Sequence, residues 1–380
     1  MALRVAMVGD VPADRSRLVG GVQSATIYLL EGLVANPEVE VHAITLDYRA
    51  AQDSRHEERG VIYHRLAVPP RFGLLTAHAA ARARLNRLLD RIAPDVVHGL
   101  GTGVHSYAAL HTGLPALLTV HGVQREDARY LGGVRNRLHG WLQAIWIERW
   151  CVTHARHVIV ISPYLLRALP QLCRASLYHI PNPVADSFFD LRPQAEPGRI
   201  LCAGVLTRRK RVLDALAAVA RVRAVVPNVQ LRLAGAATDP AYRRQLERFV
   251  AAHSLEPCVA FLGPLSADAL ADELQRAALL LLTSSQETAP VVIAEAMAAG
   301  KAVVATRVGG IPNMVEEGRT ALLTRPGAIA ETAAALQQLL TNPAECAALG
   351  RRGREYACQH FGVEQVAAAT LAVYRKIGSG

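Results

Sequence analysis

The 380-residue chain is long enough for two or three domains, and 51% hydrophobic against 19% charged residues indicates well-buried cores rather than extended disorder. Its net charge of +10 is spread over both halves, because residues 1–190 hold 20 basic and 16 acidic side chains and the remainder hold 22 and 16. Such an excess suits an anionic substrate, an anionic membrane surface or a solvated basic surface, whereas no nucleic-acid-binding motif is present.

The first half of the chain alternates short apolar runs with amphipathic stretches. This pattern predicts a parallel sheet with helices on both faces. The first run stops at Gly9, too early for a signal sequence, and no apolar stretch reaches the ~18 residues of a membrane span. The segments Gln52–Gly60 and Pro69–Ala77 are expected to be loops. The predicted strands are Leu3–Val8, Val41–Leu46, Val61–Leu66, Val96–His98, Ala116–Val120 and His157–Ile161.

Two small motifs in this half are candidates for ligand contact. The pair Gly20-Gly21 precedes a predicted helix that runs through Val34. Glycine lets backbone approach a ligand closely, although such a pair more often marks a plain turn. His121 directly follows the predicted strand Ala116–Val120, a place where a histidine is usually structural.

All three tryptophans, Trp141, Trp146 and Trp150, lie in the Arg-rich stretch Arg135–Arg156. Trp and Arg suit the headgroup zone of a membrane, so an interfacial helix is one interpretation. The three rings can also share one helical face, and we favour their packing inside the protein. A second Arg-rich stretch, Arg82–Arg91, is predicted to be a solvated amphipathic helix.

The six cysteines bear on the compartment of the protein. They show no Cys-x-x-Cys spacing and lie mostly in apolar runs, which favours reduced thiols and a cytoplasmic protein, with the inner face of the membrane as an alternative location.

Two prolines mark the boundary between domains. Pro181 and Pro183 interrupt regular structure before the polar stretch Asp190–Gly198. We therefore predict domains over residues 1–188 and 189–360, followed by a terminal segment, 361–380.

The second half repeats the alternation of apolar runs and predicts a second sheet of the nucleotide-binding type. A terminal helix is predicted over Val363–Ile377. The predicted strands are Arg199–Ala203, Gln230–Leu233, Val259–Leu262, Ala278–Leu282, Ala302–Ala305 and Ala321–Thr324.

The first of these strands is followed by the basic run Arg208-Arg209-Lys210. Arginine offers a planar fork to phosphate oxygens and lysine a compact point charge, so the run suits a diphosphate leaving group. The alternative is a solvated basic turn.

The segment Ser285–Met297 places Glu287 and Glu295 eight residues apart, across a junction from loop to helix. We predict that the helix begins at Pro290 and that its dipole, with the amides of Thr288, Ala289, Val291 and Val292, favours a bound diphosphate. Glu295 would accept hydrogen bonds from ribose hydroxyls, and Glu287 would lie nearer the sugar. Alternatively, both glutamates only complement the helix dipole.

A long block of this half resembles the donor domain of family 4 retaining glycosyltransferases. The block runs through Glu295-Ala296-Met297-Ala298 to Thr306 and the turn Gly309-Gly310-Ile311-Pro312. Lys210 matches the lysine of the family motif "GRLxxxKG", but Val205 stands where its arginine would be, so Arg208 or Arg209 would supply that cation. Pro290 stands where glycine is frequent, and Asn313 replaces the glutamate of "GGxPE".

The resemblance implies an α/β fold of the GT-B type: two Rossmann-like domains with parallel sheets facing across a cleft, and a terminal helix that crosses back to the N-terminal domain. The N-terminal domain would bind the acceptor and the C-terminal domain the nucleotide sugar. Gly20 and Gly21 would face the donor phosphates, and His121, in the sequence "TVHG", would contact the transferred sugar.

The implied reaction moves a hexosyl group from a nucleoside diphosphate sugar, UDP- or GDP-linked first of all, to an acceptor hydroxyl with retention. The acceptor would be a glycan, a glycolipid or a small molecule, with a peripheral membrane contact as an added expectation. No Asp-x-Asp motif is present, and we expect neither a metal nor a cofactor. Rival interpretations are a sugar-nucleotide 2-epimerase and a catalytically silent binding protein. A dinucleotide oxidoreductase is a weaker alternative, because no Gly-x-Gly-x-x-Gly motif opens either half of the chain.

Overall fold

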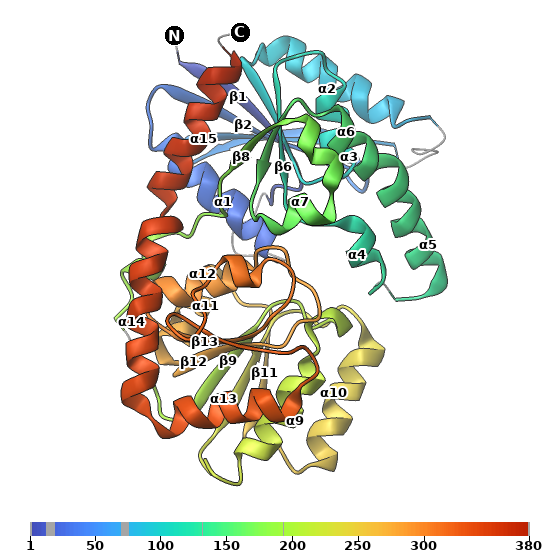
Figure 1. The fold of residues 1–380 in the computed structure, drawn as a ribbon. Coiled ribbons are helices and arrows are strands. Elements are labelled where there is room, and N and C mark those ends of the chain that lie inside the picture. Colours follow the sequence, from blue (N-terminus) through green and yellow to red (C-terminus); the bar gives the residue numbers. More distant parts are fainter. Residues whose placement is uncertain (1, 13–19, 70–75, 131, 193, 379–380) are drawn as a thin grey trace. The chain divides into compact units, whose positions relative to one another are not determined.

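The computed structural model describes residues 2–12, 20–69, 76–130, 132–192 and 194–378. Contacts divide the chain into two compact units (Figure 1). Unit 1 comprises residues 1–13, 26–182 and 363–380, and unit 2 comprises residues 14–25 and 183–362. The division after Asn182 falls slightly before the predicted boundary at residue 188. Residues 70–75 of the predicted loop Pro69–Ala77 lie outside the described residues.

Unit 1 is built on an eight-stranded sheet in the order β3-β4-β2-β1-β5-β6-β7-β8. All pairs are parallel except β3 with β4. The apolar runs form strands because β-branched and leucine side chains fill both covered faces of a parallel sheet. The strands are β1 (Leu3–Val8), β2 (Val39–Asp47), β3 (Ser54–Glu58), β4 (Val61–Ala67), β5 (Val96–Leu100), β6 (Ala116–Val120), β7 (His157–Val160) and β8 (Ser176–His179).

The prediction of a loop over Gln52–Gly60 is wrong, because this segment contains β3, an antiparallel edge strand paired with β4. Its sequence, Ser-Arg-His-Glu-Glu, is polar throughout and almost fully exposed. Its pairing comes from backbone hydrogen bonds at a sheet edge, where charged side chains are common. The segment therefore has no apolar run from which a strand could be predicted.

Helices cover the unit 1 sheet. The terminal helix α15 (Val363–Gly378) belongs to this unit and contacts β5 and β6. The Tyr374 hydroxyl lies 2.6 Å from His98 Nδ1, and both side chains are fully buried. The other helical segments are α1 (Gly21–Val34), α2 (Ala79–Ile92), α3 (Val104–Leu110), α4 (Gln124–Ala128), α5 (Val134–Gln143), η2 (Ala144–Glu148), α6 (Arg149–His154), α7 (Tyr164–Ala168) and η3 (Pro170–Arg174).

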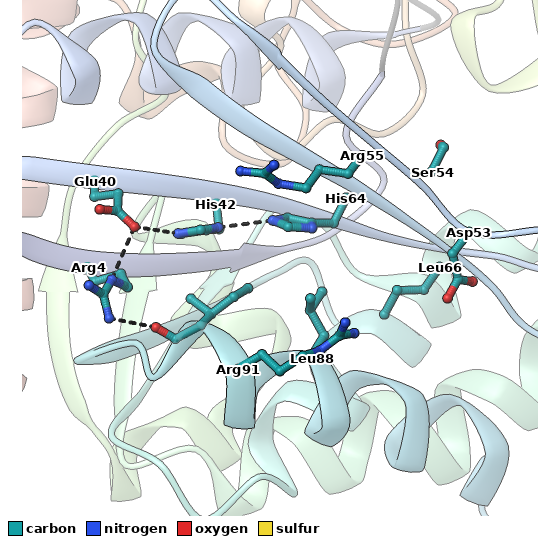
Figure 2. A pocket seen from close by; sticks show the side chains of 11 residues that line it. Arg4, Glu40, His42, Asp53, Ser54, Arg55, His64, Leu66, Leu88 and Arg91 are labelled. Atoms are coloured by element: carbon teal, nitrogen blue, oxygen red, sulfur yellow. Dashed lines mark hydrogen bonds and ion pairs between the residues drawn. The ribbon is translucent and has the colours of Figure 1, made fainter.

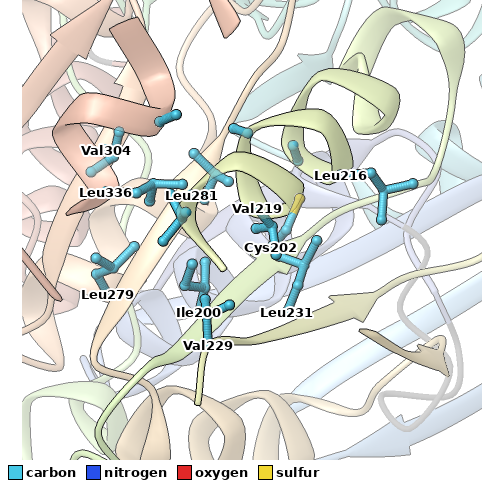
Figure 3. Packing of buried hydrophobic residues seen from close by; sticks show 14 of the residues in the cluster. Ile200, Cys202, Leu216, Val219, Val229, Leu231, Leu279, Leu281, Val304 and Leu336 are labelled. Carbon is cyan, nitrogen blue, oxygen red and sulfur yellow. The ribbon is translucent and has the colours of Figure 1, made fainter. Parts of the chain in front are cut away.

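Unit 2 contains a six-stranded, fully parallel sheet in the order β11-β10-β9-β12-β13-β14. Its core gathers Ile200, Val219, Leu231, Leu281 and Leu336, all at most 1% exposed (Figure 3). The strands are β9 (Arg199–Ala203), β10 (Gln230–Ala234), β11 (Val259–Gly263), β12 (Leu279–Leu282), β13 (Ala302–Thr306) and β14 (Leu322–Thr324). The helical segments are α8 (Asp186–Phe189), η4 (Arg208–Lys210), α9 (Val212–Val222), α10 (Pro240–Ala252), α11 (Ala267–Arg276), α12 (Val291–Ala298), η5 (Ile311–Asn313), α13 (Ile329–Thr341) and α14 (Pro343–His360).

The strand order of unit 2 defines a topological switch point. From β9 the chain builds outward through β10 to β11, then returns to the other side of β9 and builds outward from β12 to β14. In open α/β sheets, ligands bind outside the carboxyl ends of the strands at such a point. The residues that follow β9 and β12 therefore form the candidate site.

Candidate functional site

The loops after β9 and β12 are hydrogen-bonded to each other. The backbone carbonyl of Arg209 accepts from the Ser285 amide at 2.8 Å and from the Ser285 hydroxyl at 3.0 Å. The Thr283 hydroxyl donates to the carbonyl of Lys210 at 3.0 Å. The fold thus brings the predicted basic run and the start of the two-glutamate segment to one place.

Glu287 lies at the centre of this cluster with only 5% of its surface exposed. Lys210 Nζ and the Ser284 hydroxyl each donate to Glu287 Oε1 at 2.6 Å, and an Arg209 guanidinium nitrogen lies 3.2 Å from Oε2. Burial alone would raise the pKa of Glu287. The charges of Lys210 and Arg209, with the hydrogen bonds from Lys210 and Ser284, outweigh burial and lower that pKa below its usual value, so the carboxylate is ionised at neutral pH.

The structure distinguishes Arg209 from Arg208. Arg209 also donates to the carbonyl of Gln286 at 2.8 Å, which holds its guanidinium beside Glu287. The Arg208 side chain is 53% exposed, lies 3.6 Å from the Asp239 carboxylate and extends over the ring of Tyr242. Of the two arginines, only Arg209 reaches the cluster.

Gly309, in the turn after β13, lets a third strand connection approach Glu287. Its φ of +53° is one that side chains disfavour, and a Cβ atom at this position would lie 1.7 Å from the Glu287 carbonyl oxygen. The next amide, that of Gly310, donates to the same oxygen at 3.0 Å. The Gly-Gly turn therefore fixes the backbone of Glu287.

Helix α12 begins at Val291, so the prediction that Pro290 is its first residue is wrong by one position. Pro290 is the N-cap, with an extended ψ of 115°, and its missing N–H costs nothing there. Among the described residues, the amides of Thr288, Val291 and Val292 have no hydrogen-bond acceptor. Free amides at a helix N-terminus attract anions.

Glu295, the fifth residue of α12, is only 2% exposed. It lies one turn behind the free amides, on the same helix. Ala289, the remaining predicted amide donor, lies in the loop just before the N-cap.

Sequence reasoning missed Ser284 and Thr306. Ser284 is fully buried and donates to Glu287, while the Thr306 hydroxyl donates to the Ser284 carbonyl at 2.6 Å. The available signal was the run Thr283-Ser284-Ser285, three hydroxyl side chains directly after a buried apolar strand. Such hydroxyls can satisfy a buried carboxylate and the neighbouring backbone.

His121 follows β6 in unit 1 and is partly exposed, but both ring nitrogens are buried and lack a hydrogen-bond partner among the described residues. Burial lowers the pKa of His121 to about 4, against an opposing effect of the Asn182 side chain, so the ring is neutral at pH 7. Gly20 has a φ of +103° and Gly21 is the first residue of α1. The ligand contacts predicted for these three residues remain predictions.

The preferred interpretation of the tryptophans is wrong for two of them. Trp141 and Trp146 are 51% and 69% exposed, whereas Trp150 stacks on His111 and His154. The reason is that α5 contains no buried residue, so the apolar face that the sequence pattern assigned to packing stays uncovered. We call this face the Trp surface; it comprises Val134, Leu138, Trp141, Leu142, Ile145 and Trp146.

None of the helices within the described ranges has the length and apolar character needed to cross a bilayer. All six cysteines are free thiols, and burial raises the pKa of the Cys151, Cys202 and Cys346 side chains.

Comparison with known proteins identifies the family of the chain. Residues 19–188 match the model of Glycosyltransferase Family 4, and residues 184–356 match the model of Glycosyl transferases group 1. The chain is 30% identical over 319 residues to the glycogen synthase of Mycobacterium tuberculosis, covering 79% of this chain and 74% of the relative. It is also 30% identical over 332 residues to the alpha-maltose-1-phosphate synthase of Mycolicibacterium smegmatis, covering 78% and 83%.

Among solved structures, the sucrose-phosphate synthase from Thermosynechococcus elongatus superposes with a TM-score of 0.79 at 24% identity, with 99% of each chain covered. Two α/β units with largely parallel sheets, together with this structural similarity, define a GT-B glycosyltransferase fold. The chain belongs to the family 4, group 1 glycosyltransferases and is a hexosyltransferase that uses a nucleotide-sugar donor. These findings confirm the predicted fold class and the predicted enzyme class.

Proposed function

We propose that Lys210 and Arg209 bind the diphosphate of a UDP- or GDP-hexose and stabilise the charge that develops as its bond to the sugar breaks. The observation that supports this most directly is the Lys210–Glu287–Arg209 cluster, in which two cations meet one buried carboxylate at the switch point of the sheet. Preorganised cations in a partly buried site stabilise such charge far better than water does. Arg208 has no part in this proposal, because its side chain extends toward α10.

The neighbouring residues have complementary roles in the proposal. The amides of Thr288, Val291 and Val292, with Ala289 in the same loop, would donate to phosphate oxygens at the start of α12. Glu287 would accept from sugar hydroxyls while Lys210 turns toward phosphate, and Glu295 would accept from the ribose. Gly20 and Gly21 would face the phosphates, and the neutral ring of His121 would contact the transferred hexose.

We further propose that the reaction retains the anomeric configuration and needs no divalent metal. The electron pair of the broken C–O bond passes to the departing diphosphate, where Lys210 and Arg209 offer the positive charge that a metal ion supplies in other enzymes. The acceptor oxygen bonds to the same face of the sugar, and its proton leaves with the diphosphate.

A test of this reaction is proton NMR of the sugar released when purified enzyme is mixed with α-linked UDP- and GDP-hexoses in EDTA, with water as the acceptor. We expect the α-anomer of the free hexose to appear first, before mutarotation. First appearance of the β-anomer would contradict retention. Isomerised donor without released hexose would select the epimerase, and activity only after adding Mg²⁺ or Mn²⁺ would contradict metal independence.

For the acceptor, we propose a glycan or glycolipid hydroxyl, reached by the enzyme in the cytoplasm at the inner face of the membrane. The support is the Trp surface, whose six large apolar side chains are 36% to 75% exposed. Arg135, Arg137 and Arg149 are the charged residues that accompany it between residues 132 and 150, apart from the buried Glu148. Exposed Trp and Leu beside arginines suit the interface of an anionic bilayer.

Vesicle sedimentation tests the membrane contact. We expect the enzyme to sediment with vesicles that contain anionic phosphatidylglycerol and much less with pure phosphatidylcholine, and a Trp141→Ser/Trp146→Ser variant to remain in the supernatant. Val225→Ser, which removes an apolar side chain of similar exposure, 51%, from unit 2, is the matched control. Equal sedimentation of the wild type and the Trp variant would contradict the contact.

A further inference from the structure

A pocket of about 550 Å³ opens in unit 1 between α2 and the strands β1, β2, β3 and β4 (Figure 2). Leu66, Leu88 and Ile92 form its apolar part, and polar side chains from all five elements complete the lining. This volume lies within the range that holds small-molecule ligands.

The pocket is distinct from the place where the sugar-transfer reaction is expected in unit 1. Arg4, Glu40 and His42 line it from the first residues of β1 and β2. His121 follows the carboxyl end of β6, and β1, β2 and β6 all run parallel in one sheet. The strand order separates the two places: β4, which carries His64, is divided from β6 by β2, β1 and β5. The pocket therefore lies on the β3–β4 side of the sheet, away from His121.

The carboxylates of the pocket are already neutralised by neighbours. Glu40 Oε1 accepts from Arg4 Nε at 3.1 Å and lies 2.8 Å from His42 Nε2 (Figure 2). Asp53 Oδ1 accepts from the Ala67 amide and from Arg84, both at 2.8 Å. Positive charge at the pocket is therefore in excess.

The excess charge belongs to Arg55 and Arg91, which both line the pocket. Neither forms an ion pair with another described residue, and Arg91 makes only a hydrogen bond to the backbone carbonyl of Arg87. The charges of both guanidinium groups help lower the pKa of His64, so the two arginines act on the same ring from β3 and from α2.

The buried pair of His42 and His64 supplies an acceptor between these cations. A hydrogen bond from His42 and the charge of Arg4 lower the pKa of Glu40, so its ionised carboxylate can only accept, and His42 Nε2 donates to it. In the neutral pair, His42 Nδ1 then accepts from His64 Nε2 at 3.0 Å. This tautomer leaves the lone pair of His64 on Nδ1, and burial together with the nearby charges lowers the pKa of His64 to about 4, so the ring stays neutral.

We propose that this pocket binds a small phosphomonoester that carries a free hydroxyl, with Arg55 and Arg91 donating to the phosphate and His64 Nδ1 accepting from the hydroxyl. Guanidinium groups match the spacing of phosphate oxygens. The lone pair on His64 Nδ1 would accept a hydrogen bond from the hydroxyl on the carbon part of the ligand, which inorganic phosphate lacks. The apolar part around Leu66, Leu88 and Ile92 would cover the carbon atoms of the ligand.

Calorimetric titration of the full chain with glycerol 3-phosphate and with inorganic phosphate tests the proposal. We expect Arg55→Gln and Arg91→Gln each to weaken binding of both compounds roughly tenfold or more, which corresponds to about 1.4 kcal/mol. Arg87→Gln is the matched control, since Arg87 lies one turn before Arg91 on α2 and does not line the pocket. It should bind as the wild type does.

Two further variants identify the site and the hydroxyl contact. Lys210→Ala removes a cation of the proposed donor site and should leave the affinity of the pocket for both compounds unchanged. The proposal would be overturned if Lys210→Ala lost this affinity while both arginine variants kept it. His64→Leu should weaken glycerol 3-phosphate severalfold more than inorganic phosphate. Equal effects on the two compounds would overturn the assignment of His64.

Discussion

The Lys210–Glu287 ion pair makes a quantitative prediction for the stability of unit 2. Glu287 is 5% exposed, and Lys210 is its nearest cation at 2.6 Å. Removing one partner of a buried pair costs about 3 to 5 kcal/mol, because the other charge is left without compensation. Since Arg209 remains 3.2 Å from Glu287, we expect Lys210→Met to lower the free energy of unfolding by about 3 kcal/mol, at the lower end of that range.

The double variant Lys210→Met/Glu287→Gln removes both charges and should recover most of this loss. The expected coupling energy of the double-mutant cycle is about 2 kcal/mol, within the range for residues in direct contact. Arg208→Ala, in which the deleted side chain is 53% exposed, is the control and should change stability by no more than about 0.5 kcal/mol.

The assay must report on unit 2 alone. All three tryptophans lie between residues 141 and 150, in unit 1, so intrinsic tryptophan fluorescence does not follow unit 2. Hydrogen exchange of the β9 and β12 amides, measured by mass spectrometry in increasing urea, reports the unfolding of the sheet that carries the site. Additive effects of the two substitutions, with a coupling energy below about 0.5 kcal/mol, would refute the buried-pair argument.

Substitutions at Gly309, Lys301 and His121 each test one feature of the structure. Gly309→Ala should reduce both the stability of unit 2 and donor affinity, since its Cβ would overlap the Glu287 carbonyl; calorimetric affinity equal to that of the wild type would contradict this. Burial lowers the pKa of Lys301 to about 8, so at this residue the unfolded state binds more protons, and its contribution to the stability of unit 2 should rise from pH 8 to about 10.5. The buried thiols of Cys202 and Cys346, whose pKa values are raised, act in the opposite direction, so the contribution is measured by hydrogen exchange as the difference between the wild type and Lys301→Met. A difference that does not change over this pH range would contradict the prediction. With the pKa of His121 at about 4, kcat/KM should show no histidine titration between pH 5.5 and 8, and a sigmoidal step near pH 6.5 that His121→Asn removes would refute the buried neutral ring.

The sequence predicts most of the fold because apolar runs are a direct signal of strands buried on both faces. β1, β6 and β9 have the predicted bounds, and the other predicted strands differ by one or two residues at one end or, for β2, at both. β3 and β8 were not predicted, because they are mostly exposed edge strands. Backbone pairing at a sheet edge requires no apolar side chains, so it leaves no apolar run in the sequence. The prediction that the tryptophans are buried was wrong for a different reason. An apolar stripe on a helix shows which face is apolar, but not whether another part of the chain packs against it.

The candidate site was only partly predictable. Glu287 and Lys210 could be found from their positions after predicted strands, but the choice between Arg208 and Arg209 could not. Adjacent side chains on a 3₁₀ turn point in different directions, and only the tertiary structure shows which one turns toward Glu287 and which toward Asp239. The pocket around His64 had no signal in the sequence, because its lining comes from five separate elements.

The binding of a donor diphosphate by Lys210 and Arg209 can be measured by calorimetric titration of UDP-, GDP-, ADP- and TDP-hexoses into the wild type, Lys210→Ala, Arg209→Ala and Arg208→Ala. We expect one nucleotide class, UDP or GDP first of all, to bind the wild type, Lys210→Ala and Arg209→Ala each to lose at least roughly tenfold in affinity, and Arg208→Ala to bind normally. Wild-type affinity in the Lys210 and Arg209 variants, or a loss confined to Arg208→Ala, would contradict this expectation.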